Sequence, residues 1–180
     1  MNDRVKVEIK DGVADVRMVR TDKMNALDDA MFSALIETGE ALKTTQGARA
    51  VVLSGEGRAF CAGLDMGSFA AMASGERNRG AADGGTLLTP NRTPGGSNRA
   101  QWCYEPFNDL IHKAKVVSDQ AVPVIAAIHG VAFGGGFQLA LAPDMRFVTA
   151  DTRMAVMEIK WGLVPDMGGM VLMRHLAGAT

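Results

Sequence analysis

The chain has 180 residues, and its 19 Lys and Arg residues nearly balance its 20 Asp and Glu residues, leaving a net charge of −1. A protein that grips a polyanion needs a positive excess, so this balance argues against nucleic-acid binding. With 47% hydrophobic and 22% charged residues, the composition is that of an ordinary globular protein, and the length suits one domain over residues 1–180.

Local features of the sequence argue against a membrane protein, a secreted protein and a zinc protein. The longest apolar stretch, residues 121–128, is far shorter than the roughly 20 residues that span a bilayer. The N-terminus alternates charged and apolar residues and lacks the apolar core of a signal peptide. Cys61 and Cys103 are too few for a disulfide framework or a zinc site. We therefore expect a cytoplasmic protein with no membrane segment and no bound metal.

The first third of the chain predicts a hairpin followed by a strand–helix–strand unit. Apolar and charged residues alternate over residues 5–9 and 14–18, on either side of Asp11-Gly12, a dipeptide that tolerates the positive φ of a tight turn. Residues 28–43 carry apolar side chains at helical spacing, and the valine-rich run 50–53 indicates a buried strand. A strand, a helix and a strand in this order predict a βαβ crossover.

The rest of the chain begins with a segment of unusual composition. Residues 74–100 are rich in glycine and poor in large apolar groups, which predicts a mobile loop, either a lid over a binding site or simple disorder. Regular patterns return beyond it. They predict helices near 107–114, at 137–142 and at about 169–176, and strands at 122–129, 145–149 and 153–157.

Two segments place glycine and small residues directly after predicted strands, where a backbone can approach a ligand closely. They are residues 59–66 and 129–138. Each presents backbone N–H groups at the start of a helix, which suits developing negative charge, although tight turns are the alternative interpretation. The second segment is not a dinucleotide fingerprint, because Leu139 stands where the third glycine belongs, and it lacks the Gly-Lys-Ser/Thr of a P-loop.

Taken together, these segments resemble the crotonase family of enoyl-CoA hydratases and isomerases. The second match begins at Pro123. Further matching stretches at Lys23-Met24-Asn25-Ala26-Leu27, Ala150-Asp151 and 158–169 complete the resemblance, in family order and over nearly the whole chain. It implies an α/β fold of repeated ββα units. Crotonases usually continue beyond the equivalent of Thr180 into helices that complete the acyl pocket, so the C-terminal helical part is expected to be missing or truncated here.

The resemblance also implies the ligand and the assembly. The substrate is expected to be an unsaturated fatty acyl-CoA thioester of fatty acid metabolism, with no cofactor beyond the coenzyme A that carries the acyl group. A homotrimer or hexamer is expected if the C-terminal helices are present. Lys23 and Arg20 lie where crotonases bring basic side chains to the coenzyme A phosphates, with a solvated turn as the alternative. The residues that the resemblance places near coenzyme A or the acyl chain are Lys23, Met24, Ala26, Ala62, Asp65 and Met66.

In the family, two backbone N–H groups hold the thioester carbonyl, and the matching positions here are Leu64 and Gly135. Removing a proton beside a thioester carbonyl, or adding to the α,β-double bond, places negative charge on the carbonyl oxygen. Two preorganised donors stabilise that enolate more than they stabilise the neutral substrate. The two positions are therefore expected to form an oxyanion hole.

Family hydratases use two glutamates, and their positions correspond to Gln138 and Glu158. Since glutamine cannot accept and return a proton near neutral pH, Glu158 is expected to be the principal proton carrier and Gln138 a polar orienting residue. Asp166 follows Glu158 at the spacing found in dienoyl-CoA isomerases and is expected to be the second acid–base group. Double-bond isomerisation is slightly favoured. The alternatives are a 2-enoyl-CoA hydratase that uses Glu158 alone and a non-catalytic acyl-CoA-binding subunit.

Overall fold

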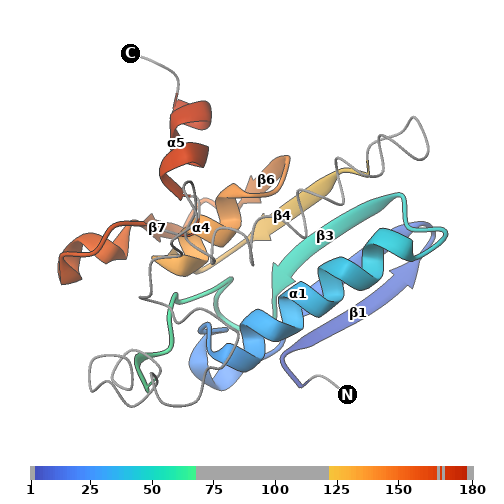
Figure 1. The fold of residues 1–180 in the computed structure, drawn as a ribbon, viewed down its shortest axis with the longest axis horizontal. Helices are drawn as coiled ribbons and strands as arrows, with labels where there is room; N and C mark the ends of the chain where they lie inside the picture. The colour runs from blue at the N-terminus through green and yellow to red at the C-terminus, as the bar shows by residue number, and fades with distance from the viewer. Residues whose placement is uncertain (1–2, 68–121, 166, 168, 178–180) are drawn as a thin grey trace, which may run out of the picture.

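The computed structural model describes residues 3–67, 122–165, 167 and 169–177, which form an α/β structure with two sheets (Figure 1). The larger sheet has the order β1-β2-β3-β4-β6, and the smaller one pairs β5 with β7. The strands are β1 (Val5–Lys10), β2 (Val13–Met18), β3 (Ala50–Gly55), β4 (Val124–Ile128), β5 (Val131–Phe133), β6 (Met145–Val148) and β7 (Arg153–Ala155). The helices are α1 (Asp29–Thr44), α4 (Gly135–Leu141) and α5 (Gly169–Ala177), with short 3-10 helices η1 (Thr21–Lys23) and η3 (Met157–Trp161).

The predicted hairpin is confirmed. Strands β1 and β2 pair in antiparallel fashion from Val5 opposite Met18 to Lys10 opposite Val13. Asp11 and Gly12 connect them with φ angles of 51° and 86°, the pair of positive values that a two-residue hairpin turn of the favoured twist requires.

The predicted βαβ crossover is confirmed as well. Strand β3 lies parallel to β2, and α1 connects them across one face of the sheet (Figure 1). Asp28 precedes the first helical residue rather than belonging to the helix, and its side chain accepts a hydrogen bond from Met31 N at 2.8 Å, which satisfies a donor of the first turn. Alternate residues of β2 and β3 enter the hydrophobic core with the inner face of α1, among them Val16, Leu53 and Leu35.

In the second sheet, the sequence patterns predicted β7 but missed β5. The predicted strand 122–129 ends at Ile128, and after Gly130 a new strand, β5, pairs with β7. The predicted strand 153–157 ends at Ala155, because its partner β5 ends at Phe133. The last hydrogen bond between the two runs from Gly134 N to Ala155 O, at 2.9 Å. A three-residue strand beside a glycine turn carries too little alternation to be recognised from sequence.

Two isolated bridges join segments that are far apart in the chain. Leu27 pairs with Leu64, and Cys61 pairs with Ala132 of β5. The glycine-containing segments 59–66 and 129–138 therefore lie side by side, which sets up the site described below.

The last sequence predictions to compare are a loop, a helix and the lack of a membrane segment. The loop 74–100 and the helix near 107–114 lie outside the described residues. Within the part of the chain that the structure describes, no helix is both long and apolar enough to cross a membrane.

Candidate active site

A cavity of about 170 Å³ lies where the two glycine-containing segments meet. Leu64 and Gly135, the expected oxyanion donors, line it together with Glu158, the expected proton carrier. The other lining residues are Ala62, Gly63, Met66, Phe133, Gly134, Met157, Trp161 and Leu163. The structure thus brings five of the residues selected from sequence, namely Leu64, Gly135, Glu158, Ala62 and Met66, to one cavity with largely apolar walls.

The backbone around Leu64 is fixed by Leu27. Leu27 N donates to Gly63 O at 2.7 Å, and Asp65 N donates to Leu27 O at 2.9 Å, which is the pattern of a parallel bridge. In such a bridge the flanking peptide groups bond to the partner strand, so the N–H of the central residue points away from it. The Leu64 N–H therefore points away from Leu27.

Close backbone approach explains the glycines on both sides of the cavity. Gly63 has φ 97°, and a Cβ there would lie 2.6 Å from Phe133 O and 3.8 Å from Gly135 N. A Cβ on Gly136 would lie 2.4 Å from Cys61 O. A side chain at Gly63 or Gly136 would push the two segments apart, whereas glycine lets the Leu64 and Gly135 peptides share one cavity.

Gly135 is the first residue of α4 and follows the N-cap Gly134. The first N–H groups of a helix have no acceptor within it, so the Gly135 N–H is available to a ligand. Gly134 also lies against the acid–base group, because a Cβ there would be in van der Waals contact, at 3.5 Å and 3.6 Å, with the two carboxylate oxygens of Glu158. The carboxylate thus lies beside the start of α4.

Gln138 holds one side of the Glu158 carboxylate. Its Nε2 donates to Glu158 Oε1 at 2.7 Å, while its Oε1 accepts from Met167 N at 2.8 Å and Gly169 N at 3.0 Å. Two N–H donors can be satisfied only by the amide oxygen, so the orientation of the Gln138 amide is determined. Glu158 Oε2 is buried and has no hydrogen-bond partner among the described residues.

Two features of the site were not predicted from the sequence. One is the 3-10 helix that carries Glu158, and the other is most of the apolar side chains that line the cavity. Glu158 belongs to η3 rather than to the end of a strand, and η3 also supplies Met157 and Trp161 to the cavity. Phe133 comes from the unrecognised strand β5. Neither element is long enough to show a hydrophobic period, so no pattern marked these residues. Asp166 lies outside the described residues.

The residues expected near coenzyme A lie around the segment that leads to α1. Lys23 is exposed, Met24 has φ 49°, and Ala62 N donates to Met24 O at 2.9 Å, which ties this segment to the first glycine segment. Ala26 is buried and Met66 is 60% exposed at the cavity. The Lys23 ammonium is therefore open to a ligand.

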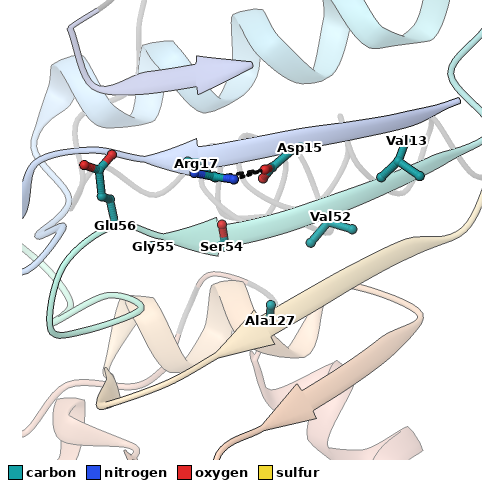
Figure 2. Close-up of a pocket in the computed structure, with 8 residues that line it drawn as sticks. All are labelled: Val13, Asp15, Arg17, Val52, Ser54, Gly55, Glu56 and Ala127. Carbon is teal, nitrogen blue, oxygen red and sulfur yellow. Dashed lines mark hydrogen bonds and ion pairs between the residues drawn. The ribbon is translucent and has the colours of Figure 1, made fainter. Parts of the chain in front are cut away.

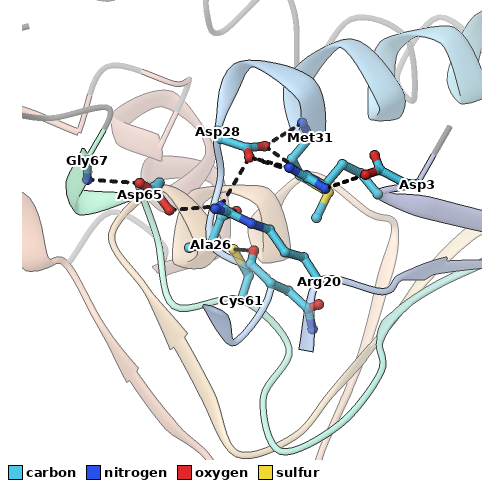
Figure 3. Close-up of polar contacts among 10 residues, drawn as sticks. Asp3, Arg20, Ala26, Asp28, Met31, Cys61, Asp65 and Gly67 are labelled. Atoms are coloured by element: carbon cyan, nitrogen blue, oxygen red, sulfur yellow. Dashed lines mark hydrogen bonds and ion pairs between the residues drawn. The ribbon is translucent and has the colours of Figure 1, made fainter. Parts of the chain in front are cut away.

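The Arg20 side chain is already paired within the protein, whereas the resemblance placed it near the coenzyme A phosphates. Its Nη1 lies 2.9 Å from Asp65 Oδ2 and 3.3 Å from Asp28 Oδ2, so this arginine is paired with carboxylates of the protein itself (Figure 3). Of the two basic residues expected to meet the coenzyme A phosphates, only Lys23 retains that prospect.

Cys61 is a packing residue in this site. Burial raises the pKa of its thiol to about 12, and its Sγ donates to Asn25 O at 3.1 Å. The thiol therefore stays protonated and is a poor nucleophile. Among the described residues, no group of three or more His, Cys, Asp or Glu side chains gathers as a metal site would require.

A more open pocket of about 430 Å³ lies on the face of β2, β3 and β4 opposite to that of Val16 and Leu53 (Figure 2). Its charged side chains include Asp15 and Arg17, which pair with each other through a hydrogen bond of 2.9 Å. This pocket brings together none of the residues expected from sequence, so the cavity beside Glu158 is the candidate active site.

A protein-family model described as "Enoyl-CoA hydratase/isomerase" matches residues 13–180. The chain belongs to the enoyl-CoA hydratase/isomerase family. The family is that of the crotonases, as the sequence motifs implied.

Relatives in the crotonase family carry names of more than one reaction. The chain is 36% identical over 166 residues to a Rhodobacter capsulatus protein named as an enoyl-CoA hydratase, covering 92% of this chain and 53% of the relative. It is 31% identical over 170 residues to the mouse mitochondrial Delta(3,5)-Delta(2,4)-dienoyl-CoA isomerase, covering 92% of this chain and 46% of the relative. The chain spans about half the length of these relatives.

Solved crotonase structures confirm the fold class. A crystal structure described as an enoyl-CoA hydratase from Streptomyces coelicolor A3(2) is similar with a TM-score of 0.73 and 33% identity, over 97% of this chain and 56% of that chain. A second, described as an enoyl-CoA hydratase/isomerase from Mycobacterium abscessus, has a TM-score of 0.74 and 25% identity, over 97% and 59% of the two chains.

Proposed function

We propose that this chain binds an unsaturated acyl-CoA thioester in the cavity and stabilises its enolate through the N–H groups of Leu64 and Gly135. The observation that carries the proposal is that these two residues line one cavity with Glu158. Two fixed donors stabilise the negative charge that develops on the thioester oxygen, and each lowers the barrier by roughly 3 kcal/mol.

Glu158 is the proton carrier in this proposal, and Oε2 is the atom that carries the proton. Oε1 is occupied by the Gln138 amide, whereas Oε2 has no partner among the described residues. In isomerisation, Oε2 removes a proton from carbon 2 of a 3-enoyl thioester, and the electron pair forms the enolate. The same carboxyl then returns the proton to carbon 4, which moves the double bond from position 3 to position 2.

The orientation of Gln138 favours isomerisation over hydration. Hydration needs groups that accept a proton from water, but Gln138 Oε1 already accepts two backbone hydrogen bonds. Gln138 can thus offer a water only its remaining N–H, which does not remove a proton. Hydration by Glu158 alone is the second candidate, because Oε2 can itself deprotonate a water and the Rhodobacter capsulatus relative is named as a hydratase.

The remaining parts of the proposal concern groups around this centre. Asp166 is the second acid–base group, and coenzyme A lies along Lys23, Met24, Ala26, Ala62, Asp65 and Met66. The reaction needs no cofactor beyond the coenzyme A of the substrate, since enolate formation and proton return are complete without one. A homotrimer or hexamer is the proposed assembly if the C-terminal helices are present.

The reaction is tested by incubating the protein with 2-enoyl-, 3-enoyl- and 3,5-dienoyl-CoA in heavy water. Isomerisation moves the double bond and incorporates deuterium at the carbon that is reprotonated, whereas hydration yields a 3-hydroxyacyl-CoA. Binding of all three thioesters without conversion would instead identify a non-catalytic acyl-CoA-binding subunit.

Replacing Glu158 should stop the reaction. Glu158→Gln removes Oε2, the oxygen that takes the proton from carbon 2, so it should abolish turnover while acyl-CoA binding changes little. Turnover is followed by the absorbance of the conjugated thioester, and binding by calorimetry. Undiminished turnover by the variant would refute the assignment of Glu158.

A further inference from the structure

Two arginines and three aspartates form a network beside the segment that carries Leu64 (Figure 3). Arg4 Nη2 lies 3.0 Å from Asp28 Oδ2, and Arg20 Nη1 connects Asp28 to Asp65. The Arg20 side chain is only 14% exposed. Asp3 also pairs with Arg4, at 2.8 Å. Because three carboxylates face two cations, the network has no positive excess with which to hold a phosphate, and its role must be sought in what it connects.

Arg20 connects three segments through a single nitrogen. Besides Asp28 and Asp65, Nη1 donates to Ala26 O at 3.0 Å. The arginine therefore joins the end of β2 to the segment before α1, to the N-cap of α1 and to the residue after Leu64. With so little exposure, these charge-assisted contacts are stronger than ion pairs on an open surface.

Asp65 transmits this connection to Leu64. Its backbone N–H bonds to Leu27 O, and its side chain accepts from Gly67 N through Oδ1 at 2.8 Å and pairs with Arg20 through Oδ2. The residue that follows Leu64 is thus held through its backbone and through both oxygens of its side chain. A shift of Asp65 would turn the Leu64–Asp65 peptide and, through Leu64, the adjoining Gly63–Leu64 peptide that carries the Leu64 N–H.

We propose, on the basis of the proposed function, that Arg20 is a positioning residue that aims the Leu64 N–H at the thioester oxygen by holding Asp65. An oxyanion donor acts through its orientation, and a misplacement of about 1 Å can cost roughly a hundredfold in rate. Arg20 touches no reacting atom in this proposal. Its effect should appear in the polarisation of the thioester carbonyl and in kcat.

The test compares Arg20→Met and Asp65→Asn with Arg4→Met as the matched control. Arg4→Met removes an arginine from the same network but from the side of Asp28. The readout is the infrared stretching frequency of a ¹³C-labelled carbonyl in bound, saturated acyl-CoA, which falls when the oxygen accepts hydrogen bonds. Arg20→Met and Asp65→Asn should weaken this fall and lower kcat roughly ten- to hundredfold. Arg20 is not among the residues proposed to hold coenzyme A, so Arg20→Met should do this with little change in acyl-CoA binding.

Arg4→Met should leave both the carbonyl frequency and kcat close to those of the wild-type protein. Arg20→Lys keeps the charge and should restore part of both effects, which a loss of side-chain packing alone would not predict. If Arg20→Met fails to fold, Asp65→Asn and Arg20→Lys decide the matter.

The outcomes separate this inference from the proposed function. A wild-type protein that leaves the carbonyl frequency of acyl-CoA unchanged overturns the proposed function and the role of Arg20 with it. A wild-type shift that persists in Arg20→Met and Asp65→Asn overturns the role of Arg20 alone. Equal losses in Arg4→Met and Arg20→Met also overturn it, because the effect would then follow from general loosening of the network.

Discussion

The hydrogen bonds of Gln138 set the chemistry available to Glu158. The family resemblance marked Gln138 as a polar orienting residue at a position where hydratases carry a carboxylate, without naming its partners. The structure adds that both of its polar ends are occupied, one by two backbone N–H groups and the other by Glu158. Such long-range partners leave no local pattern in a sequence, so this arrangement could not be predicted.

Two substitutions at Gln138 should separate its structural role from its chemical one. Gln138→Leu leaves two buried backbone N–H groups without an acceptor, so it should lower the free energy of unfolding by about 2 kcal/mol and also lower kcat. Gln138→Glu keeps an acceptor for those groups but places a second carboxyl 2.7 Å from Glu158, where the two must share a proton. Denaturant unfolding should therefore show near wild-type stability for Gln138→Glu at neutral pH, with isomerisation reduced. Equal stability of both variants would contradict this interpretation.

Asp28 should make the stability of the fold depend on pH in acid. Burial alone would raise the pKa of its carboxyl, but hydrogen bonds from Arg4 and Met31 and the charge of Arg20 outweigh burial and hold the pKa below its ordinary value of 3.8. The ionised carboxylate thus contributes stability above pH 3.8, and this contribution is lost as the pH falls through the lower folded-state pKa. Asp28→Asn can still cap α1 but has no charge to lose. Its free energy of unfolding should fall less steeply in acid than that of the wild type, and parallel curves would contradict the prediction.

At the scale of elements, the predictable parts are those whose side chains repeat. The β1–β2 hairpin and the β2–α1–β3 unit follow from alternation, helical spacing and one Asp-Gly turn, and the structure has them where the patterns placed them. Strand β5 and the short helix η3 were not predicted, because each is too short to show a repeating pattern of apolar side chains. These two elements form part of the cavity wall, so its apolar residues were the least predictable feature of the site.

The start of α4 offers a test of the oxyanion hole at this scale. Proline suits the first position of a helix, where its missing N–H breaks no helical hydrogen bond, and Gly135 occupies that position. Gly135→Pro should therefore keep α4 but delete the donor, lowering kcat roughly a hundred- to thousandfold. The control is Gly135→Ala, whose Cβ meets the side-chain ends of Leu27 at 3.0 Å and Met167 at 3.1 Å as the proline ring also would. A folded Gly135→Pro protein with the kcat of Gly135→Ala would show that the N–H does not act.

At the scale of the whole molecule, the proposed site exists only when distant parts of the chain meet. Leu64, Gly135 and Glu158 come from three separate segments, joined by the Cys61–Ala132 bridge and the β5–β7 pairing. An unfolded chain cannot assemble two converging N–H donors and a carboxylate. An acyl-CoA ligand should therefore bind the native state alone and shift the unfolding equilibrium by mass action.

The size of that shift can be predicted. At a ligand concentration of about one hundred times Kd, native-state binding adds about 2.7 kcal/mol, which for a chain of this length raises Tm by roughly 5–10 °C. Saturated acyl-CoA is the suitable ligand, because it cannot turn over during a calorimetric scan. The corresponding free fatty acid, which lacks both the thioester and coenzyme A, should produce little shift at the same concentration. A Tm that rises equally with the fatty acid would place the binding energy in apolar contacts of the cavity wall rather than in the two donors and the coenzyme A contacts.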